Sequence, residues 1–260
     1  MESFFSLPAG WQALFATLFT WGVTALGAGM VFVFKKENKP LLDATLGFAA
    51  GVMIAASFWS LLLPAEEKAA ANGHSAALAV TGGFLCGGFF LFLGDRLFSR
   101  LWEKGEGGSS RKRCALLIFS ITLHNIPEGL AIGVAFGSAD ARGAIAAAWA
   151  LALGIGIQNF PEGSAVSVPL RREGKSPLSA FLVGQASGIV EPAAAVIGAL
   201  AAQKMQTVLP FCLSFAAGAM IYVVAEELIP ESQAGGNRDV TALTTLFGFA
   251  LMTALDVALG

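Results

Sequence analysis

The sequence contains "LHNIPEGLAIG" at 123–133 and "IQNFPEGSAVS" at 157–167. Both stretches place Asn-x-Pro-Glu-Gly inside a long apolar run. A charged side chain at bilayer depth costs at least about 2.5 kcal/mol, so it normally faces a cavity or a partner. Two copies of this unfavourable arrangement indicate a function that requires buried glutamates.

Apolar runs decide the fold class. The chain has 260 residues, of which 55% are hydrophobic and 13% charged, whereas a soluble domain has about 25% charged residues. A helix of roughly 20 apolar residues crosses a bilayer. We expect an all-α polytopic membrane protein in which residues 1–260 form a single transmembrane domain that contacts the lipid bilayer and no nucleic acid. Its eight transmembrane helices are predicted at about 11–34, 41–63, 76–98, 114–137, 143–169, 178–202, 207–229 and 241–259.

The basic residues predict the orientation, because they collect in cytoplasmic loops. With eight helices, every Lys and Arg except Lys68, Arg142 and Lys204 falls at one face, in the connections between helices 1–2, 3–4, 5–6 and 7–8. This predicts both termini outside and a cytoplasmic loop at 99–113. We expect a multi-pass protein of the cell membrane, which is the inner membrane in a Gram-negative cell.

Internal similarity predicts an inverted repeat. "FAAGVMI" at 48–54 returns as "FAAGAMI" at 215–221, in the second and seventh predicted helices. The two Pro-Glu-Gly motifs lie in the fourth and fifth helices, and each pair of helices crosses the membrane in opposite directions. Matching sequence in antiparallel helices is typical of secondary transporters, whose site lies near the midplane. The predicted architecture is 3+2+3.

The polar residues of the motifs suit metal chemistry. His124 and Glu128 are four residues apart and so share a helix face. Neither motif helix contains a basic residue between its ends, so the counter-charge is a proton or a metal cation. Imidazole with carboxylates suits Zn²⁺, Fe²⁺ or Mn²⁺. Together with a third carboxylate in "GQASGIVEP", the candidate residues are His124, Asn125, Glu128, Gln158, Asn159, Glu162 and Glu191.

At these residues the chain resembles the ZIP family of divalent-metal transporters, especially its prokaryotic GufA-type branch, over essentially its whole length. The resemblance implies that the seven residues line a midplane site able to hold two adjacent ions, and that Met53 adds a thioether ligand. It implies transport of zinc, and also cadmium, iron or manganese, toward the cytoplasm without a cofactor. Gln158 replaces a histidine of many members, which favours broader metal selectivity. Helices 1, 4, 5 and 6 are expected to slide as a block against the others.

Acidic groups at both ends of the predicted bundle would concentrate cations. The outer candidates are Glu66, Glu67 and His74, and the inner candidates are Asp95, Glu226 and Glu227. In the third helix, Gly83 and Gly87 form a small-residue face that suits close helix contact, either within the chain or at a homodimer seam.

The residues alone leave other functions open. Buried glutamates also serve proton relays, so the alternative is a proton-coupled transporter of a small organic substrate. An intramembrane metallo-hydrolase would use H-E-x-x-H, whereas this motif reads H-N-I-P-E, and we expect no enzymatic activity. A purely structural role, in which the polar groups hydrogen-bond one another and hold helices together, is a further alternative.

Overall fold

The computed structural model describes residues 7–33, 39–73, 75–103, 122, 125–139, 142–172, 174–204 and 207–259. Within these ranges the chain forms helices and turns but no strand. Seven of the described helices are long and apolar enough to cross a membrane. Residues 125–137 form a further helix, and most of the predicted first half of that run lies outside the described residues. The prediction of an all-helical polytopic membrane protein is confirmed at this level.

The helices overlap the predicted apolar runs. The second run continues well past its predicted end at residue 63, because "AEEKAAA" at 65–71 consists of strong helix formers. In chain order the helices are α2 (Ala9–Ala28), α3 (Met30–Val33), α4 (Lys39–Ala56), α5 (Leu63–Ala71), α6 (Ala76–Glu103), the helix 125–137, α8 (Arg142–Arg172), α9 (Pro177–Ala186), α10 (Val190–Lys204), α11 (Leu209–Val223), α12 (Ile229–Gln233) and α13 (Arg238–Leu259).

Three of the spans contain a local change of helix type. A π-helical segment, Ser57–Leu62, joins α4 to α5, and a second, Val224–Leu228, joins α11 to α12. Each begins at the same position relative to its copy of the FAAGxMI sequence, and each is followed closely by a proline, Pro64 or Pro230. A short 3₁₀ turn, Ser187–Ile189, joins α9 to α10. Such changes re-aim side chains within a helix and occur frequently at functional sites.

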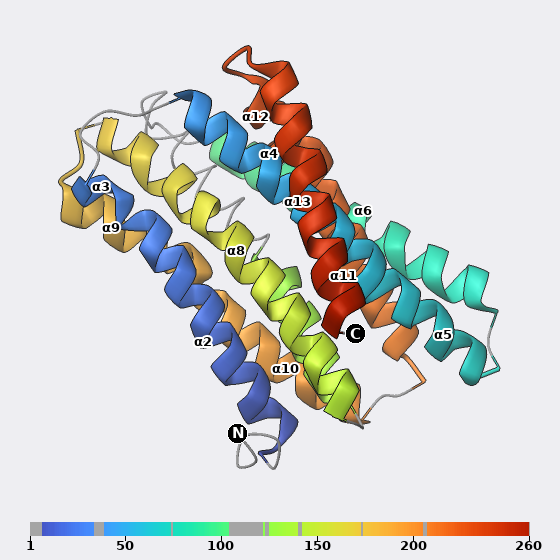
Figure 1. Ribbon diagram of the computed structural model, residues 1–260. Helices are drawn as coiled ribbons and strands as arrows, with labels where there is room; N and C mark the ends of the chain where they lie inside the picture. The colour runs from blue at the N-terminus through green and yellow to red at the C-terminus, as the bar shows by residue number, and fades with distance from the viewer. Residues whose placement is uncertain are drawn as a thin grey trace.

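The helices lie in two groups (Figure 1). In this view the helices run diagonally, with α2, α8, α9 and α10 on the lower-left side and α4, α5, α6, α11 and α13 on the upper-right side. Glycines bring helices of a group close together. A Cβ on Gly51 of α4 would lie 1.9 Å from the Thr245 carbonyl oxygen of α13, and one on Gly218 of α11 would lie 1.9 Å from the Phe84 carbonyl oxygen of α6.

Gly83 and Gly87 lie at a contact within the chain. A Cβ on Gly83 would lie 2.6 Å from the carbonyl oxygen of Phe211, and one on Gly87 would lie 1.9 Å from that of Phe215. This face of α6 therefore packs on α11, so of the two uses that the sequence left open, the internal one is observed.

The outer surface of the bundle is apolar where lipid is expected. On α13, Leu243, Leu246 and Phe247 are each about two-thirds exposed, and Phe89 and Phe90 of α6 are more than half exposed. Buried polar side chains instead concentrate inside the first group of helices. Apolar side chains outside and polar side chains inside are what a bilayer requires, because polar groups in hydrocarbon must find hydrogen-bond partners within the protein.

Candidate functional site

The described polar side chains of the two motifs lie in the interior. Asn125 and Glu128 lie on the helix 125–137, and Gln158, Asn159 and Glu162 lie on α8. None of the five is more than 6% exposed. Within each helix the glutamate lies three or four positions after the amide residues, and this spacing brings their side chains to the same side of the helix.

Glu191 joins this interior from a third helix. It follows the 3₁₀ turn Ser187–Ile189, lies in the first turn of α10 and is completely buried. The glycine of the first motif makes its approach possible, because a Cβ on Gly129 would lie 2.5 Å from the Glu191 carbonyl oxygen. The glycine of the second motif has the same function toward α2, since a Cβ on Gly163 would lie 2.1 Å from the Thr24 carbonyl oxygen.

Amide groups hold two of the three glutamates. The Gln158 side-chain amide donates to Glu128 Oε1 at 2.5 Å. The Asn159 amide donates to Glu191 Oε1 at 2.9 Å. On α2, the Thr20 hydroxyl donates to Glu191 Oε2. The donors to these carboxylates are thus neutral groups, and they carry no compensating positive charge.

The three carboxylates lie within electrostatic range of one another. Glu128 lies near enough to both Glu162 and Glu191 for their charges to repel, and Glu162 and Glu191 repel each other similarly. Like charges in a buried, low-dielectric setting repel strongly. A cation placed among them would remove this repulsion.

Several buried oxygen atoms of the site have no hydrogen-bond partner among the described residues. They are Asn125 Oδ1, Glu128 Oε2, Gln158 Oε1 and Asn159 Oδ1. The structural alternative, in which the polar groups only hold helices together, accounts for the amide nitrogens of Gln158 and Asn159 but not for these oxygens. Buried polar atoms are normally satisfied, and an exception often marks an ion or water site.

The charged side chains alone do not make a metal site in the described part of the chain. There, no three His, Cys, Asp or Glu side chains are placed to hold an ion together. Beside these carboxylates, the buried and unpartnered amide oxygens of Asn125, Gln158 and Asn159 are further candidate ligands. His124, the predicted imidazole ligand, lies outside the described residues.

Met53 lies on α4 and is completely buried in the hydrophobic core. Its carbonyl accepts a hydrogen bond from the Ser57 hydroxyl at 2.7 Å, at the start of the π-helical segment. Ligation by its sulfur stays a prediction.

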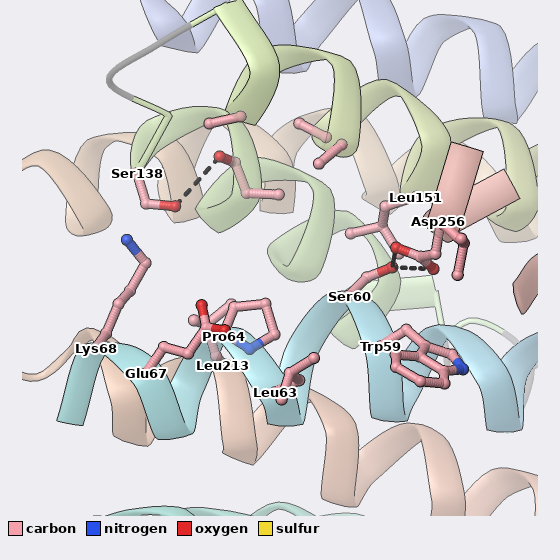
Figure 2. Close-up of a pocket in the computed structure, with 15 residues that line it drawn as sticks. Trp59, Ser60, Leu63, Pro64, Glu67, Lys68, Ser138, Leu151, Leu213 and Asp256 are labelled. Carbon is pink, nitrogen blue, oxygen red and sulfur yellow. Dashed lines mark hydrogen bonds between the residues drawn. The ribbon is translucent and has the colours of Figure 1, made fainter. Parts of the chain in front are cut away.

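A cavity of about 380 Å³ lies at the end of the bundle where α5, α13 and the turn after the helix 125–137 meet. Figure 2 shows Ser60 and Asp256 at one end of it and Lys68 and Ser138 at the other. The Ser60 hydroxyl lies 2.9 Å from Asp256 Oδ2 and 3.0 Å from Oδ1. Glu67 lines the cavity.

Among the described residues, the other outer candidate is not part of this lining. Glu66 lies exposed on α5 beside Glu67. His74 lies outside the described residues.

The inner candidates form an acidic cluster. Asp95 of α6 accepts a hydrogen bond from Tyr222 and lies near Glu226 of the second π-helical segment. Glu227 lies near enough to repel both Asp95 and the motif residue Glu162. Glu227 therefore links the charges of this acidic cluster to the charge of Glu162 in the buried site.

Sequence reasoning missed Thr20, Ser60 and Asp256. A signal existed for Asp256, because "LCGGFFLFLGD" at 85–95 and "LFGFALMTALD" at 246–256 share Leu, Gly and a final Asp at the same spacing. Asp95 and Asp256 are the last residues of these two copies. Thr20 and Ser60 carry no comparable signal in the sequence.

Comparison with known proteins identifies the family. Residues 102–256 match the family described as ZIP Zinc transporter. The chain is 41% identical to zinc transporter ZIP11 of Homo sapiens over 96% of this chain and 97% of that protein. It is 37% identical to zinc transporter GufA of Myxococcus xanthus (95% and 98%) and 40% identical to zinc transporter ZIPB of Bordetella bronchiseptica (91% and 78%). The chain belongs to the ZIP zinc transporter family.

Proposed function

We propose that the protein carries divalent metal ions, zinc foremost, through the buried site between the helix 125–137, α8 and α10. Membership of a family of membrane transporters makes it a metal-ion transporter and not an enzyme, with zinc as cargo and without a cofactor. The observation that carries the proposed site is the set of four buried, unpartnered oxygens on Asn125, Glu128, Gln158 and Asn159. They lie among carboxylates that repel one another.

The proposed ligands are the carboxylates of Glu128, Glu162 and Glu191, the three amide oxygens, the His124 imidazole and the Met53 thioether. Carboxylate, imidazole and sulfur together suit zinc and cadmium, while a set rich in oxygen also admits iron and manganese. Glu128 pairs with Gln158 and Glu191 with Asn159. These two carboxylate–amide pairs support a site for two adjacent ions.

We further propose one transmembrane domain, residues 1–260, with eight helices in a 3+2+3 inverted repeat and both termini outside, in the cell membrane. Matching contacts support the repeat. Gly51 packs on α13 as Gly218 packs on α6, and Gly129 packs on α10 as Gly163 packs on α2. The two π-helical segments begin at matching positions of the FAAGxMI copies. A homodimer stays a proposal that draws no support from Gly83 and Gly87.

The proposed route runs toward the cytoplasm. Metal enters the cavity that contains Glu67 and Asp256, and Glu66 lies exposed beside Glu67 on α5. His74 stays a predicted capture residue. It passes the central site and leaves along Glu227, Glu226 and Asp95. The electrostatic contact between Glu227 and Glu162 supports this order of sites. Acidic groups at each end raise the local cation concentration.

Metal uptake into proteoliposomes tests the proposal. We would compare zinc, cadmium, iron and manganese, with a pH-sensitive dye inside to detect proton movement. The double variant Glu128→Gln, Glu162→Gln removes two buried charges at constant shape and should reduce uptake of every metal to background. Asp239→Asn, at an exposed carboxylate in the first turn of α13, is the control and should transport normally. Normal zinc uptake by the double variant would refute the proposed site.

A further inference from the structure

The first transmembrane helix contributes to the buried site through a residue that neither motif contains. Thr20 of α2 is completely buried, and its hydroxyl donates to Glu191 Oε2. The same hydroxyl lies 3.1 Å from the Thr17 carbonyl oxygen. A hydroxyl has one hydrogen to donate. The ionised carboxylate is the stronger acceptor of the two, because charge-assisted hydrogen bonds are shorter and stronger than neutral ones.

The two oxygens of Glu191 have different partners. Oε2 faces Thr20, whereas Oε1 accepts from the Asn159 amide at 2.9 Å. The Asn159 nitrogen is also 3.4 Å from the Thr20 carbonyl oxygen, so both groups of Thr20 face this corner of the site. Oε1 is therefore the oxygen on the side of α8, next to the unpartnered Asn159 Oδ1.

The next residue of α2, Trp21, supports the same contact between α2 and the turn before Glu191. Trp21 Nε1 donates to the Gln185 carbonyl at 2.8 Å, immediately before the 3₁₀ turn that leads into Glu191. Gly188 within that turn leaves room for these contacts, since a Cβ there would lie 3.0 Å from Trp21 Cδ1 and 3.2 Å from Glu191 Oε1. Thr20 and Trp21 thus hold the side chain of Glu191 and the turn that precedes it.

We propose that Thr20 is a positioning residue of the metal site, which fixes Glu191 through Oε2 so that Oε1 alone faces the ion. This inference rests on the proposed function of Glu191 as a ligand. Second partners that orient a ligand typically change metal affinity or activity by about 10–100-fold when removed. Because α2, α8 and α10 belong to one group of helices, the Thr20–Glu191 bond persists if that group moves as a unit.

Thr20→Val tests the inference, because it removes the hydroxyl at nearly constant volume. Zinc affinity of the purified protein, measured by competition with a chromophoric chelator, should fall by about 10–100-fold, and the KM for uptake should rise more than Vmax falls. Thr20→Ser retains the hydroxyl and should restore affinity to within about threefold of the original, since the donor to Oε2 is kept.

Thr17→Val is the matched control. Thr17 is also a completely buried threonine of α2, but among the described residues its hydroxyl donates only to the backbone carbonyls of Ala13 and Leu14. Its substitution should leave zinc affinity unchanged. Comparing thermal unfolding of the metal-free variants separates loss of packing, which both valines share, from loss of the ligand's partner.

Glu191→Gln, measured in parallel, separates the role of Thr20 from the proposed metal site itself. If Glu191→Gln weakens zinc binding while Thr20→Val does not, the role of Thr20 is refuted and the proposed site stands. If Glu191→Gln binds zinc normally, the proposed site itself is wrong. If Thr20→Val does not fold, Thr20→Ala carries the same prediction, and failure of Thr20→Ser to restore affinity overturns it.

Discussion

At the scale of single residues, the site depends on adjacent amides that serve different helices. Gln158 donates to Glu128 on the helix 125–137, and Asn159 donates to Glu191 on α10. Successive residues of an α-helix point about 100° apart, so neighbours on α8 reach different partners. An amide donates through nitrogen and offers its oxygen elsewhere, whereas Lys and Arg only donate. The amides can thus stabilise buried carboxylates without a positive charge that would oppose a metal.

Gln158→His should change the selectivity of the site. One ring nitrogen can take over the hydrogen bond to Glu128, and the other becomes a ligand in place of the unpartnered Oε1. Imidazole favours zinc over manganese, which prefers oxygen. We expect zinc to compete with manganese several-fold more strongly than in the unmodified protein, measured as uptake of one labelled metal against the other.

The matched variant is Gln158→Asn, which keeps an amide at this position and adds no imidazole. It should preserve the order of metals even if the rate falls. An unchanged metal order in Gln158→His would show that residue 158 does not contact the ion.

At the scale of helices, each motif combines a ligand with a packing residue. Glu128 and Glu162 point into the site, and the glycine after each lets a neighbouring helix approach its backbone. In both motifs the glycine contacts the helix that carries another polar group of the site, Glu191 on α10 or Thr20 on α2. The glutamate supplies the polar group and the glycine lets the neighbouring helix approach, so the two residues of each motif have complementary functions.

Gly163→Ala should destabilise the protein. Its Cβ would lie 2.1 Å from the Thr24 carbonyl oxygen, so α2 and α8 must separate, and overpacking of this kind costs typically about 1–3 kcal/mol. We expect a lower midpoint of thermal unfolding in detergent and a lower rate of zinc uptake, because α2 also carries Thr20.

Gly22→Ala is the control for this prediction. A Cβ at Gly22 of α2 would meet no atom within 4 Å, and alanine is the better helix former by about 1 kcal/mol. This variant should be as stable as the original protein or more so. Equal unfolding midpoints for both variants would mean that the contact at Gly163 does not limit stability.

The helices and the burial of the motif carboxylates could be predicted from the sequence, because both depend on local patterns. Apolar runs of bilayer length predict helices, and buried glutamates in them predict a site. Thr20 could not be predicted, since Thr17, Thr20 and Thr24 look alike in the sequence and only tertiary packing gives one of them a carboxylate partner. The π-helical segments were also missed, because no residue of SFWSLL or VAEEL distinguishes an i→i+5 turn from an α-helical one.

At the scale of the whole molecule, similar groups occupy the two ends of the proposed route. Asp256 of α13 lines the cavity at one end, and Asp95 of α6 belongs to the acidic cluster at the other. Each interacts with a residue of a π-helical segment. Asp256 accepts a hydrogen bond from Ser60, and Asp95 lies within electrostatic range of Glu226 and Glu227. The ends differ in charge, since a neutral serine at the entrance corresponds to glutamate at the exit. Such asymmetry favours weak capture on one side and a continuous acidic path on the other.

Asp256→Asn should impair entry and leave the central site intact. Loss of this charge lowers the local cation concentration in the cavity, so the external zinc concentration for half-maximal uptake should rise by roughly tenfold. Zinc affinity of the central site, measured by chelator competition, should not change. Asp239→Asn, on the same helix but exposed in its first turn, should match the original protein. An unchanged concentration dependence for Asp256→Asn would exclude this cavity as the entrance.

The triple variant Asp95→Asn, Glu226→Gln, Glu227→Gln tests the exit in the same way. Glu227 lies within electrostatic reach of Glu162, so an ion leaving the central site meets its charge first. Without the cluster, release should become rate-limiting. A zinc indicator inside oriented vesicles should report a lower maximal rate without the rise in external half-saturation concentration that Asp256→Asn causes. Central-site affinity should remain nearly normal. Normal uptake by the triple variant, or loss of metal from the central site itself, would refute this exit route, whereas these distinct kinetic effects at the two ends would assign the direction of transport.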